Sequence, residues 1–91
     1  MKLGKRVLKH KMDRQHGKCY YCGCDLIKFE IDHILPFSKY RNGKTENLCL
    51  ACYGCNHLKS DKELLEFKQI LIDRYPYKLI RGMFYFEFIG I

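Results

Sequence analysis

The first apolar residues of the chain recur at roughly helical spacing: Leu3, Val7, Leu8 and Met12. This pattern predicts a short helix from about Lys5 to Gln15, and Gly17 is expected to end it. The other positions of the helix would form a basic face, made of Lys2, Lys5, Arg6, Lys9 and Arg14. Such a face either lies along a phosphate backbone or is simply solvated.

The middle of the chain has the pattern of extended structure. Residues 26–34 are apolar, β-branched and aromatic enough to predict a strand. Pro36 and the polar run 38–46 then predict a loop, and residues 48–51 are a candidate return strand. A helical turn is expected after that, over residues 56–59.

A second helix is predicted after this turn. Ser60 and Glu63 have the spacing of a capping box, which favours a helix that runs to about Arg74. Tyr75-Pro76 would stop it, because proline cannot continue a helix. The stripe that this helix would bury consists of Leu64, Phe67 and Leu71.

The end of the chain predicts two further strands, over residues 79–80 and 83–88. Phe84, Phe86 and Phe88 would share one face of the second strand, because side chains alternate between faces. We assign this aromatic row to the core, with a dimer surface as the alternative.

Length and charge narrow the class of protein. We expect the 91 residues to form one small domain, whose limited core calls for a staple such as a structural metal or disulfides. The net charge of +7 suits a polyanionic partner, because each neutralised phosphate releases counterions, but it does not choose between DNA and RNA. Residues 1–14 lack the apolar centre of a secretory leader, and no stretch approaches the ~20 apolar residues of a membrane span.

Four of the six cysteines form two C-x-x-C pairs with 29 residues between them. Two residues between cysteines let both sulfurs reach one tetrahedral zinc ion at about 2.3 Å. The sequence therefore predicts a structural zinc site, with disulfides or free thiols as the alternative, and its ligands are Cys19, Cys22, Cys52 and Cys55. A site closed by four sulfurs has no open position for water and should not be catalytic. Reduced thiolates also point to an intracellular reducing compartment, cytoplasm or nucleus.

Two cysteines lie outside these pairs. Cys24 is a competing ligand to Cys22, although the C-x-C spacing is less apt. Cys49 falls in the predicted return strand and is interpreted as a small buried apolar residue.

A second set of polar residues lies between and after the cysteine pairs. Asp32 and the side-chain carbonyl of Asn56 are oxygen donors that suit Mg²⁺ or Mn²⁺. His33 can accept a proton near neutrality, because an unperturbed histidine has a pKa of about 6.5. A zinc module with a purely structural role needs none of these three, whereas phosphodiester hydrolysis needs a hard cation and a base.

The joint pattern resembles the HNH endonuclease superfamily. It reads C-x-x-C, I-D-H-I-x-P-x-S, N-L and C-x-x-C-N-x-x-K over residues 19–61. It is similar to the zinc-bearing branch of McrA-like restriction nucleases and phage junction resolvases, and residues 56–61 also resemble the HNH domain of CRISPR effectors. The resemblance implies an α+β, ββα-metal (His-Me finger) fold, here flanked by an N-terminal helix and by a C-terminal helix plus strands.

The resemblance also implies a role for each motif residue. Asp32 and Asn56 would bind one Mg²⁺ or Mn²⁺ ion, and His33 would be the general base. Asn47 would hold the loop and orient the His33 ring. Lys59, one turn after Asn56, would contact phosphate or be only a solvated lysine.

Two features depart from the family pattern. Many members have histidine at the third motif position, where this chain has Asn56 followed by His57. Neighbouring helical residues point about 100° apart, so only one should face the ion. Asn56 is preferred because it follows the second cysteine pair and keeps the family offset to Lys59. In the family, the loop after the proline often has two glycines. Here this loop is residues 39–43, which contain one glycine, Gly43.

Geometry adds a constraint on the Asp-His pair. Adjacent residues of a regular strand point to opposite faces, so Asp32 and His33 can serve one site only at a strand end.

The function expected from the resemblance is hydrolysis of DNA phosphodiester bonds, as nicks or double-strand breaks, leaving 5′-phosphate and 3′-hydroxyl ends. Double-strand cleavage would need two active sites, for which a homodimer is one arrangement. The alternatives are a catalytically silent zinc module that binds nucleic acid, and a redox switch, although no thiol is marked as activated. Contacts with DNA are expected from Lys5, Arg6, Lys9, Arg41 and Lys44.

Overall fold

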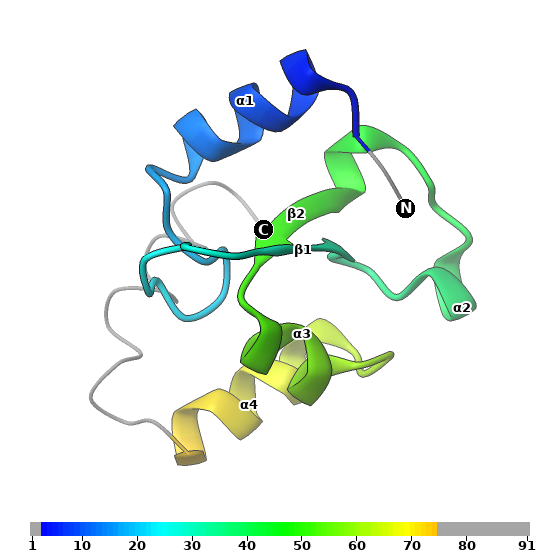
Figure 1. Cartoon of the computed structure of the whole chain (residues 1–91). Coiled ribbons are helices and arrows are strands. Elements are labelled where there is room, and N and C mark those ends of the chain that lie inside the picture. Colours follow the sequence, from blue (N-terminus) through cyan, green and yellow to red (C-terminus); the bar gives the residue numbers. More distant parts are fainter. Residues whose placement is uncertain (1–2, 75–91) are drawn as a thin grey trace.

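A computed structural model describes residues 3–74, in which two short strands lie between α1 on one side and α3 and α4 on the other (Figure 1). The elements are α1 (Lys5–Arg14), β1 (Glu30–His33), α2 (Phe37–Tyr40), η1 (Thr45–Asn47), β2 (Leu48–Ala51), α3 (Tyr53–Lys59) and α4 (Leu64–Arg74). The α+β class is confirmed. The strands predicted over 79–80 and 83–88, with their aromatic row, lie outside the described residues.

The two strands pair antiparallel, with Asp32 opposite Cys49 and His33 opposite Leu48. β2 has the predicted bounds, but the prediction of a strand over residues 26–34 was wrong for its first half. The reason is that Asp25 bridges back to Lys18, and the turn that follows leaves Ile27 93% exposed. The strand therefore begins at Glu30, where β2 supplies a partner.

The N-terminal helix α1 matches the prediction within one residue. It ends where His16 and Gly17 take left-handed backbone angles, with φ of 54° and 67°. The buried Gln15 then ties this end to β2, because its amide donates to Leu50 O at 2.8 Å and accepts from Leu50 N at 3.0 Å.

The predicted loop between the strands is partly helical, because it contains α2 and η1. The third helix starts at Tyr53, three residues before the predicted turn, since Cys52 caps it: the Cys52 sulfur accepts a hydrogen bond from Cys55 N at 3.4 Å.

The capping box predicted at Ser60 does not form. Ser60 instead ends α3, with φ of 52°, and α4 starts at Leu64. The predicted stripe of α4 is largely confirmed, since Phe67 and Leu71 are buried and Leu64 is half-buried.

The core lies between the strands, the first cysteine pair and α4. Tyr21 packs edge-on against Phe67, with ring centroids 5.1 Å apart. Ala51 of β2 is fully buried in the same cluster, and Leu50, next to it in the strand, is also fully buried. Within residues 3–74, no helix has the length and apolar character needed to cross a bilayer.

Candidate active site and metal centre

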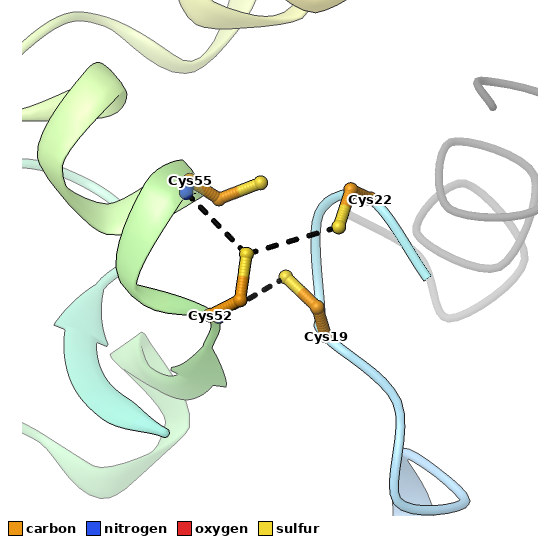
Figure 2. Close-up of side chains that lie close together, drawn as sticks. All are labelled: Cys19, Cys22, Cys52 and Cys55. Carbon is orange, nitrogen blue, oxygen red and sulfur yellow. Dashed lines mark hydrogen bonds between the residues drawn. The ribbon is translucent and has the colours of Figure 1, made fainter. Parts of the chain in front are cut away.

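The four cysteines of the two C-x-x-C pairs converge with their sulfurs facing one another (Figure 2). All four sulfur atoms lie within 4.8 Å of one another, and Cys22 Sγ is 3.8 Å from Cys52 Sγ. A tetrahedron with zinc–sulfur bonds of about 2.3 Å has edges of about 3.8 Å. The arrangement therefore fits the predicted zinc site, which joins the loop before β1 to the start of α3.

The electrostatics of this cluster also favour a cation. The neighbouring Cys22 thiol raises the pKa of Cys19, and the Cys19 thiol raises the pKa of Cys55. A hydrogen bond from Cys19 lowers the pKa of Cys52, whose sulfur also accepts from Cys55 N. Four thiolates this close together would repel one another, and a divalent cation among them would offset that repulsion.

The other two cysteines lie outside the group of four. Cys24 is half-buried and lies outside the group of four, so the predicted ligand set keeps Cys22. Cys49 is 1% exposed in β2, and burial raises the pKa of its thiol, so that it stays neutral. The interpretation of Cys49 as a buried apolar residue is confirmed.

One face of β1 is directed at α3. Asn56 Nδ2 donates to Glu30 Oε1 at 2.8 Å, and Lys59 Nζ lies 3.1 Å from Asp32 Oδ2. Both contacts can form at once because Glu30 and Asp32 lie on the same face of the strand, and Asn56 and Lys59 lie one turn apart on the same face of the helix. The strand part of the motif, on β1, is thereby brought against its helical part, on α3.

Asp32 lies in the floor of this site. It is 9% exposed, and its Oδ2 accepts a hydrogen bond from Tyr21 Oη and forms an ion pair with the Lys59 ammonium. Lys59 itself is fully buried and also donates to His33 O at 2.8 Å. The Lys59 ammonium, for which we expected a phosphate or solvent, therefore binds Asp32 and the end of β1.

His33 is the last residue of β1 and directly follows Asp32. Its half-exposed ring lies 5.1 Å from the Phe37 ring, centroid to centroid. The Asp-His pair thus stands at a strand end, which is where the sequence required it.

Asn47 holds the loop that follows His33. Its buried side chain accepts from Leu35 N at 2.9 Å and donates to Leu35 O at 3.1 Å and to Asn42 O at 2.9 Å. These bonds are made to the loop backbone and not to the His33 ring. Of the two roles expected for Asn47, they therefore show the holding of the loop and not the orientation of the ring.

Asn56 and His57 both reach Glu30. His57 Nε2 lies 3.2 Å from Glu30 Oε1, and its exposed ring stacks on Tyr53 with centroids 3.9 Å apart. Glu30 was missed by the sequence interpretation, although its position two residues before Asp32 on a strand was a usable signal. Tyr21 was also missed, because nothing in its local sequence points to Asp32.

A hollow of about 730 Å³ lies between α1 and the η1–β2 segment. Arg6, His10 and Arg14 line it, and Leu48 at its floor is the strand partner of His33. Lys11 closes one wall, since its Nζ donates to Thr45 O at 2.7 Å, and burial lowers its pKa. The hollow therefore lies beside the end of β2 that pairs with His33.

The residues expected to contact DNA are all exposed, in two groups. Lys5, Arg6 and Lys9 lie on α1, where Lys9 also pairs with Asp13 at 2.8 Å. Arg41 and Lys44 lie in the segment between α2 and η1. The α1 group adjoins the hollow through Arg6.

Together, the fold and the cysteine cluster define a small ββα domain with a metal-binding staple. A model of the HNH endonuclease family matches residues 19–62, a span that holds both cysteine pairs, both strands and α3. Over these residues the chain is similar to HNH endonucleases. A comparison with curated proteins finds no match to the chain.

Proposed function

We propose that the protein is a metal-dependent endonuclease that hydrolyses phosphodiester bonds in DNA. The main support for this proposal is that β1 and α3 face each other within the residues that match the HNH family model. The Glu30–Asn56 and Asp32–Lys59 contacts join them. A zinc module that only bound nucleic acid would have no need for Asp32, His33 and Asn56 at this meeting point.

Asp32 and Asn56 are the residues that would hold the catalytic ion. Both contacts of Asp32 engage Oδ2, and the contact of Asn56 with Glu30 engages its Nδ2. The Oδ1 atoms of both residues are hard oxygen donors of the kind that Mg²⁺ and Mn²⁺ prefer. Such an ion, when bound, stabilises the added negative charge on the phosphate and on the departing oxygen.

His33 is the proposed general base. Its imidazole accepts a proton from a water molecule, the water oxygen attacks phosphorus in line, and the bond to the 3′ oxygen breaks. Asn47 supports this step by fixing the backbone of Leu35, two residues after the base. The products carry 5′-phosphate and 3′-hydroxyl ends.

The DNA backbone is proposed to follow α1 into the hollow. Arg6 and Arg14 supply positive charge on its wall, and Leu48 links its floor to His33 through the strand register. A phosphate held at this wall would lie near the end of β1, where Asp32 and His33 follow one another. DNA is the substrate that the family resemblance implies, and the charge alone would also suit RNA.

Supercoiled plasmid tests the proposal. We expect nicked or linear DNA with Mg²⁺ or Mn²⁺, none after mild EDTA treatment that leaves the zinc in place, and full recovery when Mg²⁺ is restored. Asp32→Ala and Asn56→Ala should lose cleavage while they still bind DNA. Loss in His57→Ala with activity kept in Asn56→Ala would transfer the ligand role to His57.

A different result would favour the silent zinc module. Wild-type protein that binds plasmid but leaves it supercoiled with either ion, in zinc-loaded form, would contradict the proposal.

A further inference from the structure

The carboxylate of Asp32 is held by two donors on one of its oxygens. Tyr21 Oη donates to Oδ2, and the Lys59 ammonium lies 3.1 Å from the same atom. Because Asp32 is only 9% exposed, water has little access to compete for that oxygen. With Oδ2 fixed from two directions, the carboxylate cannot rotate freely, and the direction of Oδ1 is set.

Tyr21 comes from inside the first cysteine pair, between Cys19 and Cys22. It is 1% exposed, and its ring is wedged edge-on between Tyr20 and Phe67, with centroid distances of 5.4 and 5.1 Å. The ring position is therefore fixed by the cysteine loop on one side and by α4 on the other.

The phenol oxygen has a defined polarity. Cys49 Sγ donates to it at 3.4 Å, so its own hydrogen is directed at Asp32. The Tyr21 hydroxyl therefore acts as a donor to the Asp32 carboxylate.

The second donor comes from the other cysteine pair. Lys59 is the last residue of α3, the helix that starts after Cys52 and contains Cys55. Each cysteine pair therefore has one nearby side chain, Tyr21 or Lys59, that contacts Oδ2 of Asp32. The zinc ion that would join the four sulfurs would also fix the positions of Tyr21 and Lys59 relative to each other.

We propose that Tyr21 is a positioning residue through which the first cysteine pair orients Asp32 toward the catalytic ion. The proposal rests on the proposed function only in taking Asp32 as a ligand of that ion. Residues that orient a metal ligand by hydrogen bonding typically contribute about 10–100-fold to metal affinity or activity.

The test is Tyr21→Phe, which keeps the packed ring and removes only the hydroxyl. Tyr40→Phe is the matched control, because Tyr40 Oη also donates to a carboxylate, that of Glu63 at 2.8 Å, but on the surface. Zinc content, thermal midpoint, Mn²⁺ binding by electron paramagnetic resonance, and kcat and KM on DNA are measured for each zinc-loaded protein.

We expect Tyr21→Phe to keep its zinc, to bind Mn²⁺ about 10-fold more weakly, and to lose kcat with KM for DNA unchanged. Tyr40→Phe should match the wild type in every measurement. In an Asp32→Ala background, Tyr21→Phe should weaken Mn²⁺ binding no further, because the group it orients is gone.

Three results would overturn the proposal: wild-type Mn²⁺ affinity in Tyr21→Phe, loss of zinc from that variant, or an equal effect of Tyr21→Phe with and without Asp32. Wild-type protein that binds Mn²⁺ through Asp32 but cuts no DNA would end the nuclease proposal alone. The Mn²⁺ affinities would still decide the role of Tyr21.

Discussion

Cys49 is a thiol whose environment prevents it from ionising. It is 1% exposed, and burial raises its pKa above the ordinary value of about 8.5. The unfolded chain can release this proton above pH 8.5, whereas the folded chain cannot. Its contribution to stability is therefore present below that pH and is lost progressively as the pH rises.

Cys49→Ala should remove this pH dependence. The free energy of unfolding of the wild type should fall relative to Cys49→Ala by up to about 1.4 kcal/mol per pH unit between pH 8.5 and 10. Urea unfolding of both zinc-loaded proteins across that range measures the difference. Parallel pH profiles would contradict the interpretation of Cys49 as a neutral thiol in the core.

Among single residues, the candidate catalytic residues were easier to predict from the sequence than the residues that hold them in position. Asp32, His33 and Asn56 could be selected from the sequence because hydrolysis demands those residue types and the motif fixes their spacing. Tyr21 and the buried ammonium of Lys59 could not, since their roles depend on which distant side chain lies beside them once the chain is folded.

Among the elements, the loop before β1 and the start of α3 are joined through the cysteine cluster. Because metal-binding free energy is here folding free energy, Cys19→Ser should lose zinc and much of the folded structure. Cys24→Ser is the control, since Cys24 lies near the cluster but outside it, and it should keep about one zinc per chain. Zinc content and circular dichroism check both. Equal zinc loss from the two variants would show that the ligand set is wrong.

The junction between α3 and α4 carries backbone strain. Ser60 has φ of 52° and ψ of −127°, a region that side chains disfavour at a cost of about 1 kcal/mol or more. Ser60→Gly should relieve it and raise the thermal midpoint by about 4–8 °C for each kcal/mol gained. Ser38→Gly, within α2, should lower the midpoint instead. A lower midpoint for Ser60→Gly would remove the strain argument.

The elements themselves were predicted where local pattern decides them. α1 and β2 follow from helical and strand periodicity, and the structure has them at almost the predicted bounds. The start of β1 and of α4 could not be read from the sequence, because pairing with β2 and the turn at Ser60 override the local propensity of residues 26–29 and 60–63.

For the whole molecule, the net charge of +7 acts through its distribution. Arg6→Ala should weaken DNA binding and reduce the slope of log K against log salt by about 0.9, because one phosphate contact is lost. Arg74→Ala is the control, since Arg74 ends α4 on the other side of the strands from α1 (Figure 1). Binding is measured at several salt concentrations without Mg²⁺ or Mn²⁺. Equal slopes for wild type and Arg6→Ala would exclude α1 from the interface.

The central claim is that His33 is the general base of a DNA hydrolysis reaction. The most direct measurement is the single-turnover cleavage rate of His33→Asn on plasmid, beside His16→Asn as a histidine outside the site. We predict a loss on the order of 10²–10⁴-fold for His33→Asn, with zinc content and DNA binding kept, and a wild-type rate for His16→Asn. Cleavage by His33→Asn at the wild-type rate, in protein free of contaminating nuclease, would contradict the account.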